Sequence, residues 1–288
     1  MGLMDEAFVS RANKFVFQAA LPALVFMDLA TVDFFQVWDT KFVLFCFLAT
    51  LISISAVTML SFALKDRSIQ GEFIQAAYRS SAAILGIAFI QNIYGNSGMA
   101  PLMIVGTVPL YNIMAVVVLS LMKQDRGRMD RKLLLRTLKG VVTNPILIGI
   151  ALGMLWSLLK LPLPAIAQKT LKNLSALASP LGLMAMGAAF EVKEVGTKLK
   201  PVMLASAVKL VVLAAVFLPA AVGLGFREEK LVAILVMLGS ATTVSCYIMA
   251  KNMGHEGTLT SGTVMLTTLF SAFTLTGWLY LLRTLGHI

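Results

Sequence analysis

Long apolar runs that contain no charged residue restrict what this sequence can fold into. One of them extends from Phe42 to Leu64 without an Asp, Glu, Lys or Arg. The hydrocarbon core of a bilayer requires about 20 such residues per helix. Backbone N–H and C=O groups must be satisfied within the segment there, so the runs form helices. The sequence therefore predicts an all-α polytopic membrane protein.

Composition supports this class. Of the 288 residues, 58% are hydrophobic and only 13% are charged, whereas soluble domains are about one quarter charged. The apolar runs are joined by short polar connections, which leave no room for a soluble domain. Nine spans are predicted: Asn13–Ala30, Phe42–Leu64, Phe73–Ile93, Met99–Met122, Leu138–Leu159, Thr170–Phe190, Pro201–Gly225, Leu231–Asn252 and Thr258–Leu282.

The net charge of +10 is explained by topology rather than by nucleic-acid binding. The basic residues lie in membrane-flanking loops, chiefly in Lys123–Lys139. If this loop is cytoplasmic and the sides alternate at each span, most of the 24 Lys and Arg fall on the cytoplasmic face, as the positive-inside rule requires. We expect a multi-pass protein of the cell membrane. Binding of anionic lipid by the same loop is an alternative that we favour less.

Patterns typical of catalysis are missing from the sequence. Cys46 and Cys246 lie inside predicted spans, and His255 and His287 lie in a loop and at the terminus. No metal-ligand spacing, P-loop or nucleophile–base pair occurs. We expect no catalytic residue, no metal and no cofactor, and therefore no enzyme.

An internal repetition is the strongest functional indication. "ALPALVFMDLA" (20–30) and "ASPLGLMAMGAAF" (178–190) each place a proline in a span. Each is followed by a plain apolar span, then by a span with a polar break, "RSSAAILGIAF" (79–89) or "GSATTVS" (239–245), and then by one more span. An odd number of spans separates the equivalent members, so the copies have opposite orientation. Inverted repeats with matching broken helices indicate a secondary transporter.

The first copy is one helix short. Leu138–Leu159 precedes the proline span of the second copy, whereas only a short polar stretch precedes the first. A complete pair would have ten spans, so we expect that the first copy lacks its opening helix through truncation or a mis-assigned start.

Several segments resemble the auxin efflux carrier family, which includes plant PIN carriers and bacterial malonate-type carriers. The resemblance covers nearly the whole chain and is carried by "ALPALVF" (20–26), "GNSG" (95–98), "VPLYNIMAVVVLS" (108–120), "NPILIGIALGMLW" (144–156), "LPLP" (161–164), "ASPLGLMAMGA" (178–188) and "YIMAKNMG" (247–254). It implies two inverted five-helix repeats, an elevator-type cycle and a homodimer. It also implies that Phe73–Ile93 and Leu231–Asn252 unwind where they cross.

The resemblance also implies a division into units. Residues 1–38 and 137–195 form the scaffold, residues 39–124 and 196–288 form the transport unit, and residues 125–136 form a cytoplasmic loop. Half-helix N-termini that converge at the crossing carry about +0.5 charge each and favour a carboxylate. The substrate-binding candidates are Ser80, Ser81, Gly86, Tyr111, Asn112, Gly239, Ser240, Thr242, Thr243 and Ser245. Close helix packing by these small residues is the alternative.

The sequence departs from the family pattern at the crossing. Ser81 and Ala88 in the first crossover, and Ser245 and Ala241 in the second, stand where the family carries Asn and Pro. Without proline, Gly86 and Gly239 are expected to permit the breaks.

Three other polar residues have open interpretations. Asn112 either lines the site or forms an interhelical hydrogen bond. Asn144 precedes Pro145 and is best explained as a helix start. Lys209 is a candidate anion counter-charge or coupling residue, but it could also snorkel to the cytoplasmic surface. In the functional case, Lys209→Ala abolishes anion uptake.

These observations favour a secondary transporter of a small organic anion, a carboxylate or dicarboxylate of malonate or auxin type. Its partners would be that anion and the lipid bilayer. A membrane sensor or scaffold built on a carrier fold, which binds without transport, is the alternative. The transport prediction rests on analogy of fold.

Overall fold

The computed structural model describes residues 4–31, 38–96, 98–122 and 131–288. Within these ranges the chain is helical, and the one β-type pairing is an isolated bridge between Ser80 and Thr242. The expected all-α class is therefore confirmed. Residues 123–130 of the Lys123–Lys139 loop lie outside the described residues.

Among the described residues, four helices are long and apolar enough to cross a membrane. Two of them are uninterrupted in the first half of the chain: α3 (Thr40–Ser61) and α6 (Ala100–Leu121). The third, Leu199–Gly223, consists of α12 (Leu199–Ala207), a π-helical turn (Val208–Val212) and α13 (Leu213–Gly223). The fourth is α16 (Thr258–Thr284). All four lie where spans are predicted.

The other predicted spans are divided into shorter helices. Residues 6–30 form α1 (Glu6–Phe15), a π-helical turn (Val16–Ala20) and α2 (Leu21–Ala30). Residues 165–188 form α9 (Ala165–Ala176) and α10 (Ala178–Ala188), followed by the short α11 (Val192–Thr197). Nine spans, as predicted from hydropathy, are thus not seen as nine long helices in the described part of the chain.

The predicted span Leu138–Leu159 begins later than expected. The chain forms α7 (Arg131–Val142) and then starts a new helix, α8 (Pro145–Leu158). Asn144 accepts a hydrogen bond from the Ile146 N–H at 2.9 Å, and Pro145 occupies the first helical position, where its missing N–H costs nothing. This is the helix-start role expected for Asn144.

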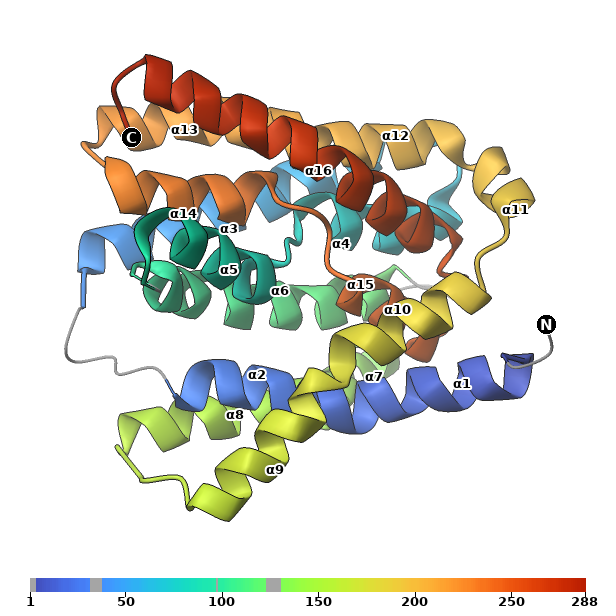
Figure 1. Cartoon of the computed structure of the whole chain (residues 1–288). Coiled ribbons are helices and arrows are strands. Elements are labelled where there is room, and N and C mark those ends of the chain that lie inside the picture. The colour runs from blue at the N-terminus through green and yellow to red at the C-terminus, as the bar shows by residue number, and fades with distance from the viewer. Residues whose placement is uncertain (1–3, 32–37, 97, 123–130) are drawn as a thin grey trace.

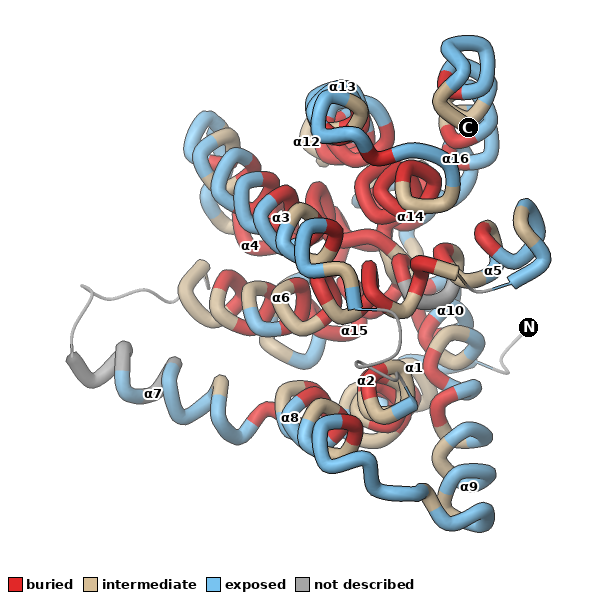
Figure 2. The backbone as a smooth tube through the Cα atoms, turned by 90° about the vertical axis from the view of Figure 1, so that its left-hand side faces the viewer, coloured by how far each residue is buried: buried red, intermediate tan, exposed pale blue. Residues whose placement is uncertain are grey.

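The helices form two groups (Figure 1). The α1–α2 helix, α8, α9 and α10 pack mainly on one another, whereas α3, α6, α12, α13 and α16 surround α4 (Gln70–Tyr78) and α14 (Glu228–Gly239). Figure 2 shows that α4 and α14 are buried almost throughout. The groups meet along α1 and α10, which contact α15 (Ser245–Asn252), and along α2, which contacts α6.

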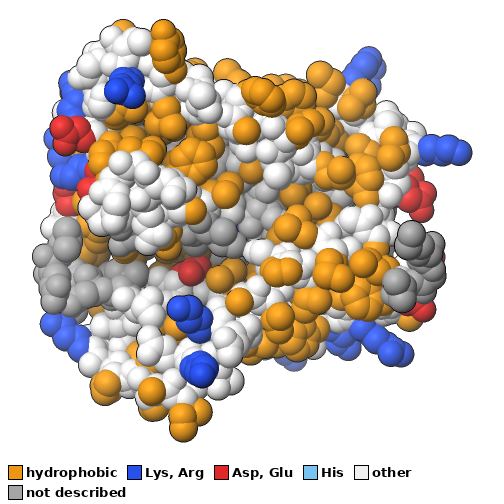
Figure 3. Space-filling model, in the orientation of Figure 1, with side chains coloured by type: hydrophobic (Ala, Val, Ile, Leu, Met, Phe, Trp, Pro, Cys, Tyr) orange, Lys and Arg blue, Asp and Glu red, His pale blue; other side chains and the backbone are white. Residues whose placement is uncertain are grey.

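Charged and apolar side chains are separated along the molecule. In Figure 3, most Lys, Arg, Asp and Glu of the visible face gather at the left and right ends, and hydrophobic side chains cover much of the middle. Large hydrophobic side chains such as Phe47, Ile52 and Met59 are also exposed on α3. A protein whose exposed middle is apolar fits a bilayer rather than water.

One buried carboxylate, Glu72, and one partly buried carboxylate, Glu229, fix the last helix of each half. Glu72, near the start of α4, accepts hydrogen bonds from the N–H groups of Gly257 (2.8 Å) and Thr260 (3.0 Å) at the N-terminus of α16. Glu229, near the start of α14, accepts one from the N–H of Met99 (3.2 Å), the residue before α6. Each acid thus caps a helix from the opposite half of the chain, where the helix dipole favours negative charge.

Candidate functional site

Two helices in the interior are interrupted. α4 ends at Tyr78, and the chain continues as α5 (Ala82–Tyr94) after three non-helical residues. In the second half, α14 ends at Gly239 and α15 begins at Ser245. Arg79 and Ser240 both have extended backbone angles (φ −82°, ψ 123° and φ −77°, ψ 166°). The interruptions fall inside the two predicted crossover segments.

The two interruptions pair with each other. Ser80 and Thr242 form an antiparallel bridge, and the Ser81 N–H donates to the Ala241 carbonyl at 3.0 Å. The Thr242 hydroxyl donates to the Ala76 carbonyl at 2.8 Å, so it satisfies an acceptor left free at the end of α4. Where each helix stops, backbone N–H and C=O groups lose their partners within the helix. Each break therefore supplies hydrogen-bond partners for such groups of the other break.

Hydrogen bonding between the breaks explains how they persist without proline. The Thr242 N–H donates to the Thr267 hydroxyl on α16 at 3.0 Å, and the Gln75 amide donates to the Cys246 carbonyl at 2.9 Å. The glycines have a smaller role than expected, because Gly86 lies inside α5 against Met103 and Gly239 is the last residue of α14. Ala88, expected at the crossing, is an exposed residue within α5.

A cavity of about 40 Å³ lies at the crossing. The N-terminal ends of α5 and α15 both reach it, through Ser81 and Ala82 in one case and Thr243 and Ser245 in the other. Its wall is completed by residues of α2, by the end of α4 and by α6. The lining residues are Leu21, Leu24, Val25, Asp28, Arg79, Ser80, Ser81, Ala82, Val108, Tyr111, Asn112, Thr243 and Ser245.

Arg79 is the only Lys or Arg among these lining residues, and it is 5% exposed. One guanidinium nitrogen donates to the Asn112 side-chain oxygen at 2.5 Å, and another contacts the Met249 sulfur. No carboxylate of the described residues forms an ion pair with it. The crossing therefore holds a buried positive charge that has polar but no anionic partners.

Tyr111 ties the crossing to α6. Its hydroxyl lies 3.2 Å from the Ser80 hydroxyl and donates to the Met237 carbonyl at 3.2 Å. The Tyr78 hydroxyl in turn donates to the Tyr111 carbonyl at 3.1 Å. Asn112 also donates to its own helix, at the Val108 carbonyl. Asn112 thus lines the cavity and forms an interhelical hydrogen bond, so both interpretations left open by the sequence apply.

The structure places the predicted binding residues in two sets. One set lines the cavity: Ser80, Ser81, Tyr111, Asn112, Thr243 and Ser245. The other set does not line it: Gly86, Gly239, Ser240 and Thr242. Thr242 in particular uses its hydroxyl and its N–H to join the two breaks and α16.

Lys209 lies behind the crossing rather than in the cavity. It sits in the π-helical turn between α12 and α13 and is 0% exposed. Its ammonium group donates to the carbonyls of Leu238 (2.6 Å) and Met237 (3.3 Å), at the C-terminal end of α14. A positive charge is favourable at a helix C-terminus. The snorkelling alternative is wrong, because the amine is directed inward.

Comparison with protein families identifies the type of protein. A family model described as membrane transport protein, of the auxin efflux carrier type, matches residues 1–279. The chain belongs to this membrane transport family. It is therefore a multi-pass membrane protein of a transporter family, as its apolar helices indicate. A search of curated proteins finds no significant match.

Two cavity residues of this transport-family protein were absent from the sequence-based candidates. Arg79 opens the polar break of the predicted span Phe73–Ile93, and Asp28 lies near the end of the first proline-containing span, but neither is among the predicted binding residues. A signal existed for both, since an ionisable residue within a hydrophobic span is a functional candidate by default. Arg79 directly precedes the two serines of the first break, and Asp28 lies in the otherwise apolar "ALPALVFMDLA".

Proposed function

We propose that this membrane transporter carries a small organic anion, whose carboxylate binds at the crossing of α4–α5 and α14–α15. The observation that carries the proposal is the buried Arg79 guanidinium. It lines the crossing cavity and pairs with no carboxylate of the described residues. Leaving a buried charge without a counter-charge costs several kcal/mol, so a bound anion at this position is strongly favoured.

The geometry around Arg79 suits a carboxylate. A guanidinium presents a planar set of N–H donors that matches the two oxygens of a carboxylate. The N-termini of α5 and α15 border the same cavity, and each contributes partial positive charge and free N–H groups. The hydroxyls of Ser80, Ser81, Thr243 and Ser245 add further donors.

The proposed mechanism is alternating access by an elevator-type movement. The α1–α2 helix, α8, α9 and α10 would form the stationary scaffold, residues 1–38 and 137–195. Residues 39–124 and 196–288 would move as the transport unit, and the Glu72 and Glu229 caps join the two halves of that unit. We further propose an inverted-repeat relation between the halves, a homodimer, and a cell-membrane location with the Lys123–Lys139 loop in the cytoplasm. Kinship with PIN and malonate-type carriers is part of the same proposal.

Counterflow in proteoliposomes tests the proposal. Vesicles loaded with unlabelled carboxylate should accumulate the same labelled compound, with acetate, propionate, malonate and succinate as the first probes. Arg79→Gln should reduce the initial rate at least about tenfold, because it removes the anion-binding charge. Arg67→Gln, which alters an exposed arginine before α4, is the matched control and should leave the rate unchanged.

The same preparation separates transport from sensing. A sensor or scaffold would bind a carboxylate, detected as thermal stabilisation of the purified protein, without any counterflow. That result would contradict the transport proposal. Equal counterflow by the wild type and Arg79→Gln would instead show that the anion binds elsewhere.

A further inference from the structure

The crossing cavity is lined by one basic and one acidic side chain. Arg79 reaches it from the end of α4, and Asp28 reaches it from α2. The two side chains do not form an ion pair with each other in the described structure. Asp28 also makes no hydrogen bond there that involves its carboxylate and another described residue. A basic and an acidic side chain thus line one small cavity without pairing with each other.

Such an arrangement complements a ligand that itself carries both charges. We propose that the substrate is a zwitterion of the amino acid class, with its carboxylate on Arg79 and its ammonium group on Asp28. The proposal deepens the proposed function and rests on it. Each charge of the ligand would compensate one charge of the cavity, whereas a simple monocarboxylate would leave Asp28 without a partner. A dicarboxylate would place its second negative charge near Asp28, which is unfavourable.

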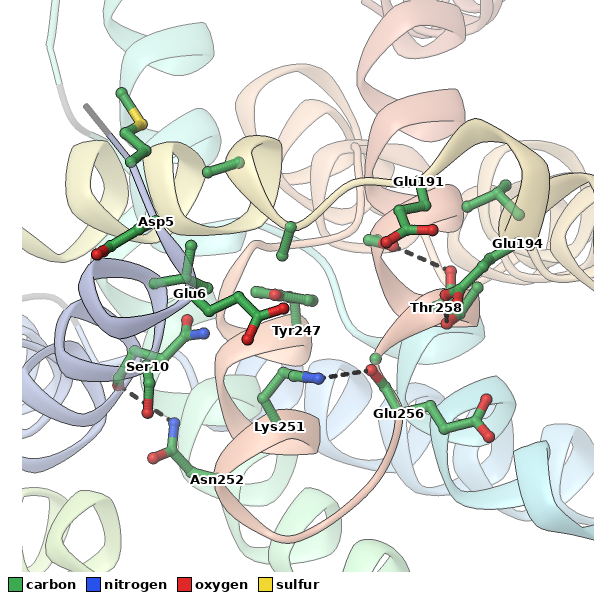
Figure 4. Close-up of a pocket in the computed structure, with 18 residues that line it drawn as sticks. Asp5, Glu6, Ser10, Glu191, Glu194, Tyr247, Lys251, Asn252, Glu256 and Thr258 are labelled. Carbon is green, nitrogen blue, oxygen red and sulfur yellow. Dashed lines mark hydrogen bonds between the residues drawn. The ribbon is translucent and has the colours of Figure 1, made fainter. Parts of the chain in front are cut away.

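A second, larger cavity on the same side of the α1–α2 helix supports this assignment. It has a volume of about 650 Å³ and is lined by Ser10 and Asn13, which continue the stripe of Leu21, Leu24 and Asp28 along one face of this helix. Tyr247 and Asn252 of α15 form the opposite wall. Figure 4 shows Ser10 of α1 and Tyr247 and Asn252 of α15 around this cavity.

The charge of this larger cavity is predominantly negative. Its lining contains the carboxylates Asp5, Glu6, Glu191, Glu194 and Glu256 and one amine, Lys251 (Figure 4). Glu256 is already paired with Lys198. The described residues include no group of three or more His, Cys, Asp or Glu that could hold a metal ion. A predominantly negative cavity repels dianions and tolerates a solute that carries an ammonium group.

Matched pairs of compounds test the proposal on the purified full-length protein. Glycine, L-alanine, L-aspartate, L-phenylalanine and γ-aminobutyrate are each compared with the acid that lacks the amino group: acetate, propionate, succinate, 3-phenylpropionate and butyrate. Dissociation constants come from the concentration dependence of thermal stabilisation. At least one amino compound should bind about 10- to 100-fold more tightly than its matched acid, because one charged hydrogen-bonded contact is added.

Two variants assign the recognition to the two charges. Asp28→Asn should abolish the preference for the amino compound while binding of the matched acid persists. Arg79→Gln should weaken both. Asp66→Asn is the matched control: Asp66 caps a short 3₁₀ turn before α4, where Asn caps equally well, so the preference should remain.

The outcomes distinguish this inference from the function on which it rests. If the acids or malonate bind as tightly as the amino compounds and exchange in counterflow, the zwitterion assignment is wrong and anion transport stands. If an amino compound is preferred equally by the wild type and Asp28→Asn, Asp28 is not the ammonium partner and the assignment is also wrong. If no compound binds and none exchanges, both the assignment and the transport proposal fail.

Discussion

At the scale of single residues, Asn112 controls how the buried guanidinium is presented. Its side-chain oxygen accepts from Arg79 at 2.5 Å, while its amide donates to the Val108 carbonyl. Arg79 is thereby held by a neutral acceptor that orients it without cancelling its charge. A carboxylate at the same position would hold Arg79 equally well and neutralise it.

Asn112→Asp is therefore expected to weaken substrate binding while the protein stays folded. The new carboxylate forms an ion pair with Arg79, so a bound anion no longer gains the full charge interaction. The dissociation constant of the compound that stabilises the wild type most should rise at least about tenfold. Asn92→Asp makes the same change at an exposed position of α5 and should have no effect. An unchanged dissociation constant in Asn112→Asp would show that Arg79 does not bind the substrate.

The sequence identifies Lys209 as an important residue but does not reveal its role. Hydropathy identifies a lysine inside a span, and such a lysine must have a partner. The partner is the end of α14, a segment that sequence patterns alone do not place beside Lys209. The structure therefore favours a positioning role for Lys209 over the anion counter-charge suggested by its depth in the span.

Lys209→Met is expected to lower stability without changing substrate affinity. The substitution keeps much of the apolar chain but removes the Lys209 donor of the buried Leu238 carbonyl, at a cost of about 1–3 kcal/mol. The Met237 carbonyl still accepts from the Tyr111 hydroxyl. Thermal unfolding and the substrate dissociation constant are measured on the same protein. Lys200→Met, an exposed change in α12, is the control. Lost counterflow with an unchanged melting temperature would instead support the counter-charge role.

At the scale of elements, the sequence determines most of the helices and little of the crossing. Hydropathy correctly locates the four long apolar helices, α3, α6, α16 and the α12–α13 helix. They can be recognised because a helix that crosses the lipid needs a long apolar segment. The two interrupted segments could also be located, because Ser and Thr cluster there. The pairing of the two segments could not be predicted, because it depends on hydrogen bonds between distant parts of the chain, such as the one from the Ser81 N–H to the Ala241 carbonyl.

The hydroxyl of Thr267 gives a test of that pairing. It is 0% exposed and accepts from the Thr242 N–H, so Thr267→Val keeps the side-chain shape and leaves a buried N–H unsatisfied. We expect a loss of about 1–3 kcal/mol in the free energy of unfolding. Thr276→Val removes an exposed hydroxyl of α16 that bonds only to its own helix, and it should be close to neutral. Equal stability of the two variants would mean that the crossing does not depend on α16.

At the scale of the whole molecule, transport by an elevator requires the two groups of helices to slide past each other. Their contact includes α1 against α15, where the Asn252 amide donates to the Asn13 carbonyl at 3.2 Å. Within the proposed transport unit the connections are stronger. The Lys230 ammonium forms an ion pair with the Asp39 carboxylate at 2.6 Å. The hydrogen bond that it donates there holds the pKa of the Asp39 carboxyl below its usual value.

Cross-linking distinguishes movement between the groups from movement within them. After replacement of the buried Cys46 and Cys246 by alanine, Ser10→Cys and Asn252→Cys place two thiols across the larger cavity, where Figure 4 shows these residues close together. Joining them with a short bis-maleimide should stop counterflow, because α15 can no longer move along α1. The pair Asp39→Cys and Lys230→Cys, joined in the same way, lies within one unit and should retain counterflow. If the first cross-link also leaves the rate unchanged, the substrate crosses the membrane without a displacement of these two groups, and a local opening of the crossing must replace the elevator.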